Sequence, residues 1–216
     1  MSGVDDARAA LAQRIRSAGH ALVGRDADAA AFEEALVHVD AAVATLEASP
    51  IRRRTGLEFG ARYDETWPDG GAVSSYDERP VSGRSSPWGL ELSMTREGDD
   101  VVALLTLQSA HEGAPGAAHG GVVAALFDDL MGISLGIPQI AAFTGELRVR
   151  YAAATPIGRP LVCRARVTNV EGRKVSVSAE LTDAEGSRTE PYATATSTYI
   201  SVDRGAFIRP TSNDRG

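Results

Sequence analysis

The chain has 216 residues, which suits one domain with an appended segment or two small domains and excludes a large multidomain machine. Hydrophobic residues make up 43% and charged residues 24%, as in soluble globular proteins, which argues against disorder over most of the chain. The formal net charge of −7 makes the molecule a poor attractor of polyanions. No nucleic-acid partner is therefore expected, and an anionic ligand would need a local basic patch.

Cysteine usage and the N-terminal residues bear on the compartment. A single cysteine, Cys163, excludes an internal disulfide framework and a multi-cysteine zinc site. We expect no metal and no cofactor. Asp5 and Asp6 stand where a signal peptide would be basic, and no run approaches the ~18 apolar residues of a membrane span. The sequence thus predicts a cytoplasmic protein without a membrane partner.

Residues 1–49 have the pattern of a helical hairpin. Apolar residues spaced three and four apart predict helices over residues 4–23 and 28–48, with Gly24 ending the first and Asp28 capping the second. Each apolar seam is narrow, so we expect the pair to dock on the main core or on another subunit. A DNA-reading helix-turn-helix is disfavoured, because residues 1–48 hold eight acidic residues and only four arginines, a net negative charge that DNA phosphates would repel.

Residues 50–87 lose this periodicity and are rich in Gly, Pro, Ser, Asp and Arg. Irregular stretches of this length are usually functional covers or linkers, and we expect a covering loop or linker here. The arginine run at 52–54 is either a phosphate contact or a solvated charge run.

Residues 88–203 have strand patterns interrupted by one helical segment, and residues 204–216 are left as a C-terminal tail. The pattern predicts a strand hairpin, then a helix from about Gly120 to Leu135, then four strands joined by short turns. The six predicted strands are 88–96, 101–109, 143–151, 160–170, 173–183 and 191–202. An antiparallel sheet with one long helix on one face is an α+β arrangement.

A small-residue loop, Glu112–Gly121, leads directly into the predicted helix. A helix start exposes unpaired amides at the positive end of the helix dipole, and Gly120 and Gly121 would let a carbonyl approach the backbone without meeting a Cβ. The loop is either an oxyanion receptor or a glycine-rich lead into a buried helix.

Within this helix, Gly121, Ala125, Asp128 and Gly132 share one face made of small residues. Asp128 lies more than two turns in, too far for capping, so we interpret it as a working carboxylate. Asp129 points about 100° away and is expected to face solvent or another subunit.

The segment 143–151 alternates cleanly. Strict alternation places Thr144 on the same face as Glu146, Arg148 and Arg150, and this face is either a ligand-binding or a solvent face. The odd-numbered residues from Phe143 to Tyr151 then face the other side.

These features together resemble the hotdog-fold acyl-CoA thioesterases of the PaaI-like branch. The run His119-Gly120-Gly121 is followed by Asp128 nine positions after the histidine, Gly132 four further on, Thr144 seven residues before Tyr151, and Thr155-Pro156. The resemblance covers roughly residues 80–203 and says nothing about residues 1–50.

The resemblance implies a long helix wrapped by a curved antiparallel sheet, in protomers that pair into a homodimer or assemble into a tetramer. It implies that the Gly120 amide, next to His119 of the motif, binds the thioester carbonyl. Asp128 of the other subunit would be nucleophile or general base, and Thr144 would position the water or the carboxylate. Many relatives carry asparagine where this chain has Gly113, and His111 or Glu112 are the neighbours that could replace it.

The expected substrate is an acyl-CoA or an acyl-carrier-protein thioester. Besides Gly121, the expected substrate-binding residues are the cations that could contact coenzyme A phosphates, namely Arg148, Arg150, Arg173 and Lys174. The alternatives are a noncatalytic acyl-CoA-binding or scaffold protein, and a hotdog-fold dehydratase, hydratase or other biosynthetic enzyme.

Overall fold

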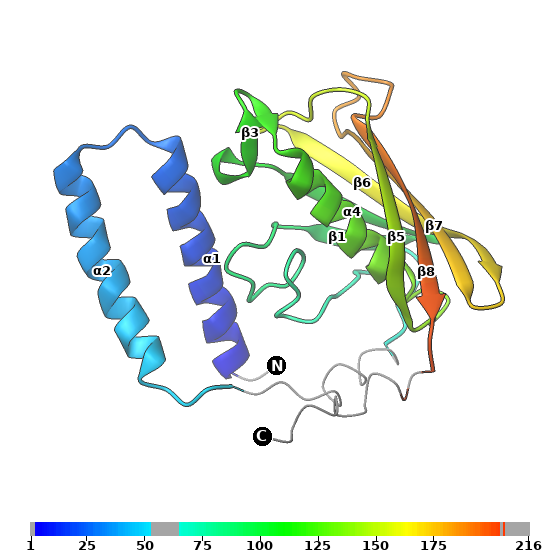
Figure 1. The fold of residues 1–216 in the computed structure, drawn as a ribbon, viewed down its shortest axis with the longest axis horizontal. Helices are drawn as coiled ribbons and strands as arrows, with labels where there is room; N and C mark the ends of the chain where they lie inside the picture. Colours follow the sequence, from blue (N-terminus) through cyan, green and yellow to red (C-terminus); the bar gives the residue numbers. More distant parts are fainter. Residues whose placement is uncertain (1–2, 53–64, 204, 206–216) are drawn as a thin grey trace.

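The protein has an N-terminal helical pair joined to an α+β domain, as the sequence predicts (Figure 1). The computed structural model describes residues 3–52, 65–203 and 205. Helices α1 (Gly3–Gly24) and α2 (Ala29–Glu47) precede an irregular segment, residues 65–92. Among the described residues no helix combines the length and the apolarity needed to cross a membrane.

A six-stranded antiparallel sheet forms the domain, with the strand order β1-β2-β6-β7-β8-β5. Its strands are β1 (Ser93–Glu97), β2 (Asp100–Thr106), β5 (Ala142–Tyr151), β6 (Pro160–Glu171), β7 (Lys174–Asp183) and β8 (Ala193–Ser201). Helix α4 (Gly120–Ser134) packs against one face of this sheet (Figure 1). Strands β1 and β5 are its two edges.

The core lies between α4 and the sheet. Alternate residues of the central strands point to the helix and are fully buried, as the two-residue period of a strand requires. From α4, Leu126, Phe127 and Leu130 reach the same layer. Burial of these apolar side chains fixes which side of α4 faces inward.

Two segments differ from the sequence prediction. The first strand begins at Ser93 rather than at residue 88, because the preceding residues fold with the irregular segment: the Leu90 amide donates to the Val81 carbonyl at 2.7 Å. The loop before α4 contains a 3-10 turn, η2 (Ser109–His111), and a small hairpin of β3 (Glu112–Ala114) and β4 (Ala117–Ala118).

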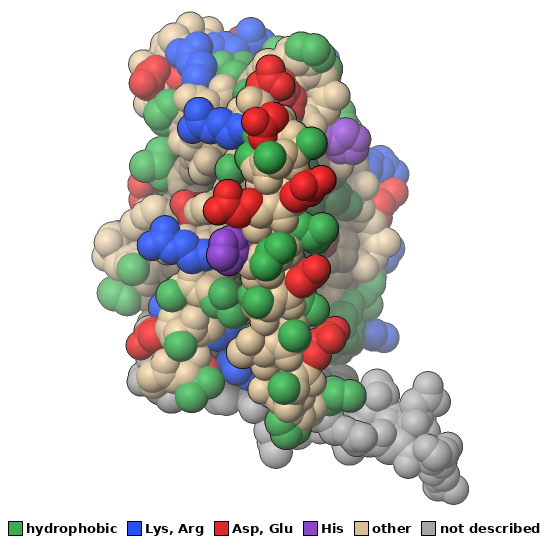
Figure 2. All heavy atoms as spheres, turned by 90° about the vertical axis from the view of Figure 1, so that its left-hand side faces the viewer, with side chains coloured by type: hydrophobic (Ala, Val, Ile, Leu, Met, Phe, Trp, Pro, Cys, Tyr) green, Lys and Arg blue, Asp and Glu red, His purple; other side chains and the backbone are tan. Residues whose placement is uncertain are grey.

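The helical pair meets the domain through α1, while α2 buries none of its residues. Asp28 caps α2 as predicted, accepting from the Ala31 amide at 2.9 Å. Figure 2 looks onto this side and shows apolar side chains interspersed with acidic ones. The apolar seam of α2, which includes Phe32 and Leu36, is exposed.

A histidine pair joins α1 to the loop that leads into α4. The rings of His20 and His111 meet edge to face at 4.8 Å, and their Nδ1 atoms accept from the Ala110 and Gln108 amides. Burial, reinforced by the neighbouring His20, lowers the pKa of His111 to about 4. Burial also lowers the pKa of His20, against the opposing effect of Glu91. The contact therefore favours the neutral form of both imidazoles.

Replacing His111 by asparagine keeps an acceptor near the Gln108 amide and removes the titration. As the pH falls from about 6.5 towards 4, unfolded His111 binds a proton that the folded chain excludes, so the wild type loses stability across this window. We expect His111→Asn to lose less, as measured by thermal unfolding midpoints over this pH range. An equal pH dependence in both proteins would contradict the prediction.

Candidate functional site

The start of α4 is held by a histidine. His119 is the N-cap residue, and its Nδ1 accepts from the Gly121 amide at 3.0 Å. Its own amide donates to the His111 carbonyl at 2.8 Å, which ties the entering loop to η2. A Cβ on Gly121 would lie 3.0 Å from this Nδ1, so glycine there leaves room for the imidazole. The Gly121 amide, expected to bind substrate, is thus engaged in the cap.

The Gly120 amide is the donor that the cap leaves open. It has no acceptor among the described residues, and the glycine is partly exposed. Its carbonyl accepts from the Tyr151 hydroxyl of β5 at 2.8 Å, which fixes the orientation of this peptide. An oriented, unpaired amide at a helix start is the arrangement that binds a developing oxyanion.

Asp128 lies exposed in the middle of α4. Its Oδ1 accepts from the Thr144 hydroxyl at 3.0 Å, and its backbone carbonyl accepts from the Tyr199 hydroxyl at 3.1 Å. Burial, followed by the negative charge of Asp128, raises the pKa of Tyr199 to about 12, so the phenol stays a neutral donor. The structure therefore brings Asp128 and Thr144 together and adds Tyr199, which the sequence analysis missed.

Strict alternation along the segment 143–151 is wrong, because β5 has a bulge. Thr144 pairs with Tyr199 and Glu146 with Thr198, which leaves Gly145 as the extra residue. The bulge turns Thr144 to the α4 side of the sheet, the side that Tyr151 also faces, whereas Arg148 and Arg150 lie on the opposite side. The glycine inside the strand is the signal that marks such a bulge.

Asp129 does not face solvent, contrary to the sequence expectation. It is buried against the protein, where its Oδ1 forms an ion pair with Nε of Arg79 from the irregular segment. The sequence offers no local signal for this partner, which lies fifty residues earlier. A buried carboxylate needs a cation or strong donors, and the segment 65–92 supplies one.

The predicted cations do not form one cluster. Arg173 and Lys174 lie at the β6–β7 turn, where Lys174 shares a cross-strand row with Ile200 and Phe143 and so lies near the Thr144 end of β5. Arg148 binds Glu146 at 3.0 Å on the outer face. In the run at 52–54, Arg52 forms an ion pair with Glu78, and residues 53 and 54 lie outside the described residues.

Gly113 and its neighbours are engaged within the loop and with α1. A Cβ at position 113 would lie 2.7 Å from the Cα of His119, so this loop has no room for a side chain there. His111 faces α1, and the Glu112 carboxylate accepts from the Gly116 amide, closing the β3–β4 turn. The described part of the chain also holds no group of three or more metal-ligating side chains.

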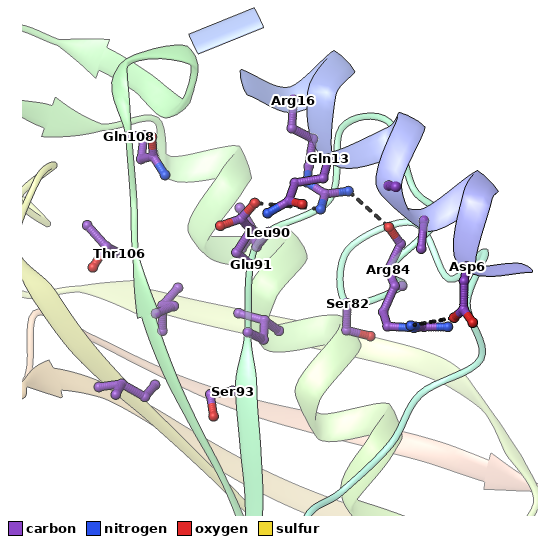
Figure 3. A pocket seen from close by; sticks show the side chains of 16 residues that line it. Asp6, Gln13, Arg16, Ser82, Arg84, Leu90, Glu91, Ser93, Thr106 and Gln108 are labelled. Carbon is purple, nitrogen blue, oxygen red and sulfur yellow. Dashed lines mark hydrogen bonds and ion pairs between the residues drawn. The ribbon is translucent and has the colours of Figure 1, made fainter. Parts of the chain in front are cut away.

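A separate cavity of about 700 Å³ lies between α1 and β2 (Figure 3). Arg16 and Arg84 contribute its cationic side chains, and both already bind protein groups: Arg16 donates to the Ser86 carbonyl at 2.7 Å and Arg84 pairs with Asp77. None of the predicted site residues on α4 or β5 lines it. The cavity is therefore distinct from the surroundings of Gly120 and Asp128.

Comparison with known proteins relates this arrangement to thioesterases. Residues 115–190 match the family model of the Thioesterase superfamily. The acyl-coenzyme A thioesterase THEM4 of Xenopus laevis is 32% identical over 84 residues, which cover 39% of this chain and 38% of that protein. THEM4 of Mus musculus is 29% identical over 92 residues, 43% of this chain and 39% of that protein. The chain thus spans under two fifths of the length of these curated relatives.

The similarity of fold extends further than the similarity of sequence. The crystal structure of protein RHA08564, a thioesterase superfamily protein, superposes with a TM-score of 0.72 at 23% identity and covers 92% of this chain and 91% of that one. The shared region includes the helical pair as well as the sheet domain, because so little of either chain is left out. The protein therefore has the hotdog fold, and its residues 115–190, which hold α4 and β5, carry the thioesterase superfamily pattern.

Proposed function

We propose that the protein hydrolyses acyl-CoA thioesters, with Gly120 as oxyanion donor and Asp128 as the reacting carboxylate. The observation that carries the proposal is the pair of features on one helix: an open amide at Gly120 and an exposed carboxylate held by Thr144. The similarity to acyl-coenzyme A thioesterases supports it.

In the proposed reaction the thioester carbonyl accepts a hydrogen bond from the Gly120 amide. The Asp128 carboxylate either takes a proton from water, whose oxygen attacks the carbonyl carbon, or attacks that carbon itself to give an anhydride that water then cleaves. In either route the amide stabilises the oxyanion of the tetrahedral intermediate, whose collapse breaks the C–S bond and releases the thiolate. In the first route the thiolate takes up the proton that Asp128 removed from water, and in the second this collapse gives the anhydride. Thr144 holds the carboxylate in place from β5.

Helix geometry supports a site shared by two copies of the chain. Gly120 and Asp128 are eight residues apart on α4, about 12 Å along the axis, too far to act on one carbonyl. β5 is an edge strand with exposed Phe143 and Tyr151, so it offers a surface for a second copy. In the proposed homodimer each site takes Gly120 from one copy and Asp128 from the other.

The rival functions differ in what they require of these residues. A hotdog dehydratase would use a histidine as acid or base, and at His119 the helix cap occupies Nδ1 and leaves Nε2 for that role, so turnover of a 2-enoyl-CoA tests it. A noncatalytic acyl-CoA-binding protein is favoured by one observation, the missing side chain at Gly113. Release of free thiol from acyl-CoA distinguishes the proposed thioesterase from a noncatalytic acyl-CoA-binding protein.

Asp128→Asn keeps the shape of the side chain and removes its charge. We expect turnover to fall by at least ~100-fold with little change in substrate affinity, because a catalytic acid-base group is lost. The measurement is thiol release from a panel of acyl-CoA and acyl-carrier-protein thioesters. Glu146→Gln, which alters an exposed acid two residues from Thr144 on the opposite face, is the matched control and should be active. Activity of Asp128→Asn near that of the control would refute the assignment.

Gly120→Pro removes the proposed oxyanion donor, and the Tyr151 ring must shift slightly to admit it, because a Cβ at position 120 would lie 3.3 Å from that ring. Proline is favoured at the first position of a helix, and His119 already has the extended backbone that a following proline requires. We expect turnover to fall by about 100-fold or more.

Coexpression of Gly120→Pro and Asp128→Asn chains then tests the shared site. A mixed dimer has one site with both groups intact, so the mixture should recover activity that neither variant has alone. Mixed dimers without activity would show that both residues act within one chain.

Reversing the charge at the β6–β7 turn tests how CoA is held. We expect Arg173→Glu with Lys174→Glu to raise KM for CoA esters at low ionic strength and to leave turnover at saturation near normal, because the lost phosphate contacts are uniform across ground and transition states. Arg148→Glu with Arg150→Glu, farther along β5 from its Thr144 end, should raise KM less. The reverse ranking would place the phosphates beside Arg148 and Arg150.

A further inference from the structure

Three segments converge on two consecutive residues in the middle of α4. Thr144 donates to the Asp128 carboxylate at 3.0 Å, and Tyr199 donates to the Asp128 carbonyl at 3.1 Å. From the irregular segment, Arg79 Nη2 donates to the Asp129 carbonyl at 3.2 Å. The peptide that links the two aspartates is therefore braced from the strands and from residues 65–92.

One guanidinium holds both the side chain and the backbone of Asp129. Nε of Arg79 pairs with Oδ1, while Nη2 binds the carbonyl of the same residue. The two side chains are 22% and 8% exposed, so the pair is shielded from water. A planar guanidinium with donors in fixed directions suits this double contact better than a lysine would.

Gly132 on α4 and Gly136 just after its end make room for the segment that carries Arg79. A Cβ at Gly132 would lie 2.7 Å from Arg79 Nη2 and 3.8 Å from the Tyr199 hydroxyl, and one at Gly136 would lie 2.5 Å from the ring of Trp67. The small-residue face is thus covered by the irregular segment at Gly132. Asp128, one turn earlier on the same face, stays exposed.

We propose that Arg79 is the positioning residue of the Asp128 carboxylate. This inference rests on the proposed function. By pairing with Asp129, Arg79 neutralises the buried member of two adjacent carboxylates, and by binding the Asp129 carbonyl it fixes the turn of α4 from which Asp128 projects. Without it, Asp129 is a buried charge without its cation, and the middle of α4 shifts to solvate it. A displacement of about 1 Å at a reacting group can cost ~100-fold in rate.

Arg79→Met tests this proposal, since methionine keeps much of the apolar stem and removes the donors and the charge. We expect kcat for acyl-CoA hydrolysis to fall by about 10- to 100-fold with KM nearly unchanged. Arg79→Lys, which keeps the charge but not the double contact, should recover kcat in part. Arg84→Met is the control: this arginine of the same segment pairs with Asp77 and Asp6, away from α4, and kcat should stay at the wild-type value.

The double variant Arg79→Met/Asp129→Asn separates positioning from general stability. It removes the buried charge together with its partner, so the unfolding midpoint should recover relative to Arg79→Met, while kcat stays low because the donor to the Asp129 carbonyl is missing. Joint recovery of midpoint and kcat would reduce Arg79 to a structural role. A rise in KM in place of the fall in kcat would make it a substrate contact and overturn the proposal.

A crystal structure of Arg79→Met gives a readout that does not depend on activity. We expect the Thr144 Oγ1 to Asp128 Oδ1 hydrogen bond of 3.0 Å to be lost. An Asp128 carboxylate in its wild-type position overturns the positioning role even if the protein proves to be no thioesterase. Full activity of Arg79→Met beside an inactive Asp128→Asn would overturn the positioning role and leave the proposed function intact.

Discussion

Helix geometry sets the constraint on which the arrangement around α4 depends. Successive residues of a helix point about 100° apart, so when Asp128 projects from the exposed face, Asp129 must turn towards the protein. The apolar residues of α4 fix that rotation by packing on the sheet, and Asp129 is buried as a result. A buried carboxylate is stable only with a partner, and Arg79 is that partner. The irregular segment 65–92 is therefore held against α4 by the chemistry of Asp129.

Much of the fold could be predicted from the sequence because its elements follow simple periods. The helix predicted from about Gly120 to Leu135 is Gly120–Ser134, and the strand predicted over 160–170 is Pro160–Glu171. Local chemistry also drew attention to the amides at the start of α4 and to Asp128, and the family resemblance singled out the Gly120 amide. Both depend on residues close in the chain, the glycines before α4 and the small residues along one face.

The remaining features depend on register or on distant contacts, which periodicity does not contain. A single extra residue at Gly145 reverses the face of Thr144 relative to Arg148, because a strand has a period of two. The partners Arg79 and Tyr199 come from positions 50 and 71 residues away from the aspartates they bind. The start of β1 moved for a similar reason: residues before Ser93 pair with the irregular segment rather than with β2.

The two parts of the chain outside the sheet domain brace opposite halves of the proposed site. From α1, His20 contacts His111, whose carbonyl receives the His119 amide at the start of α4, so the helical pair bears on the Gly120 end. From residues 65–92, Arg79 bears on the Asp128 end. If two copies share each site, the amide end of one helix works with the carboxylate end of the other. Each proposed site then depends on the helical pair of one copy and on the irregular segment of its partner. Both segments would therefore influence catalysis by supporting α4, although neither contributes a reacting group.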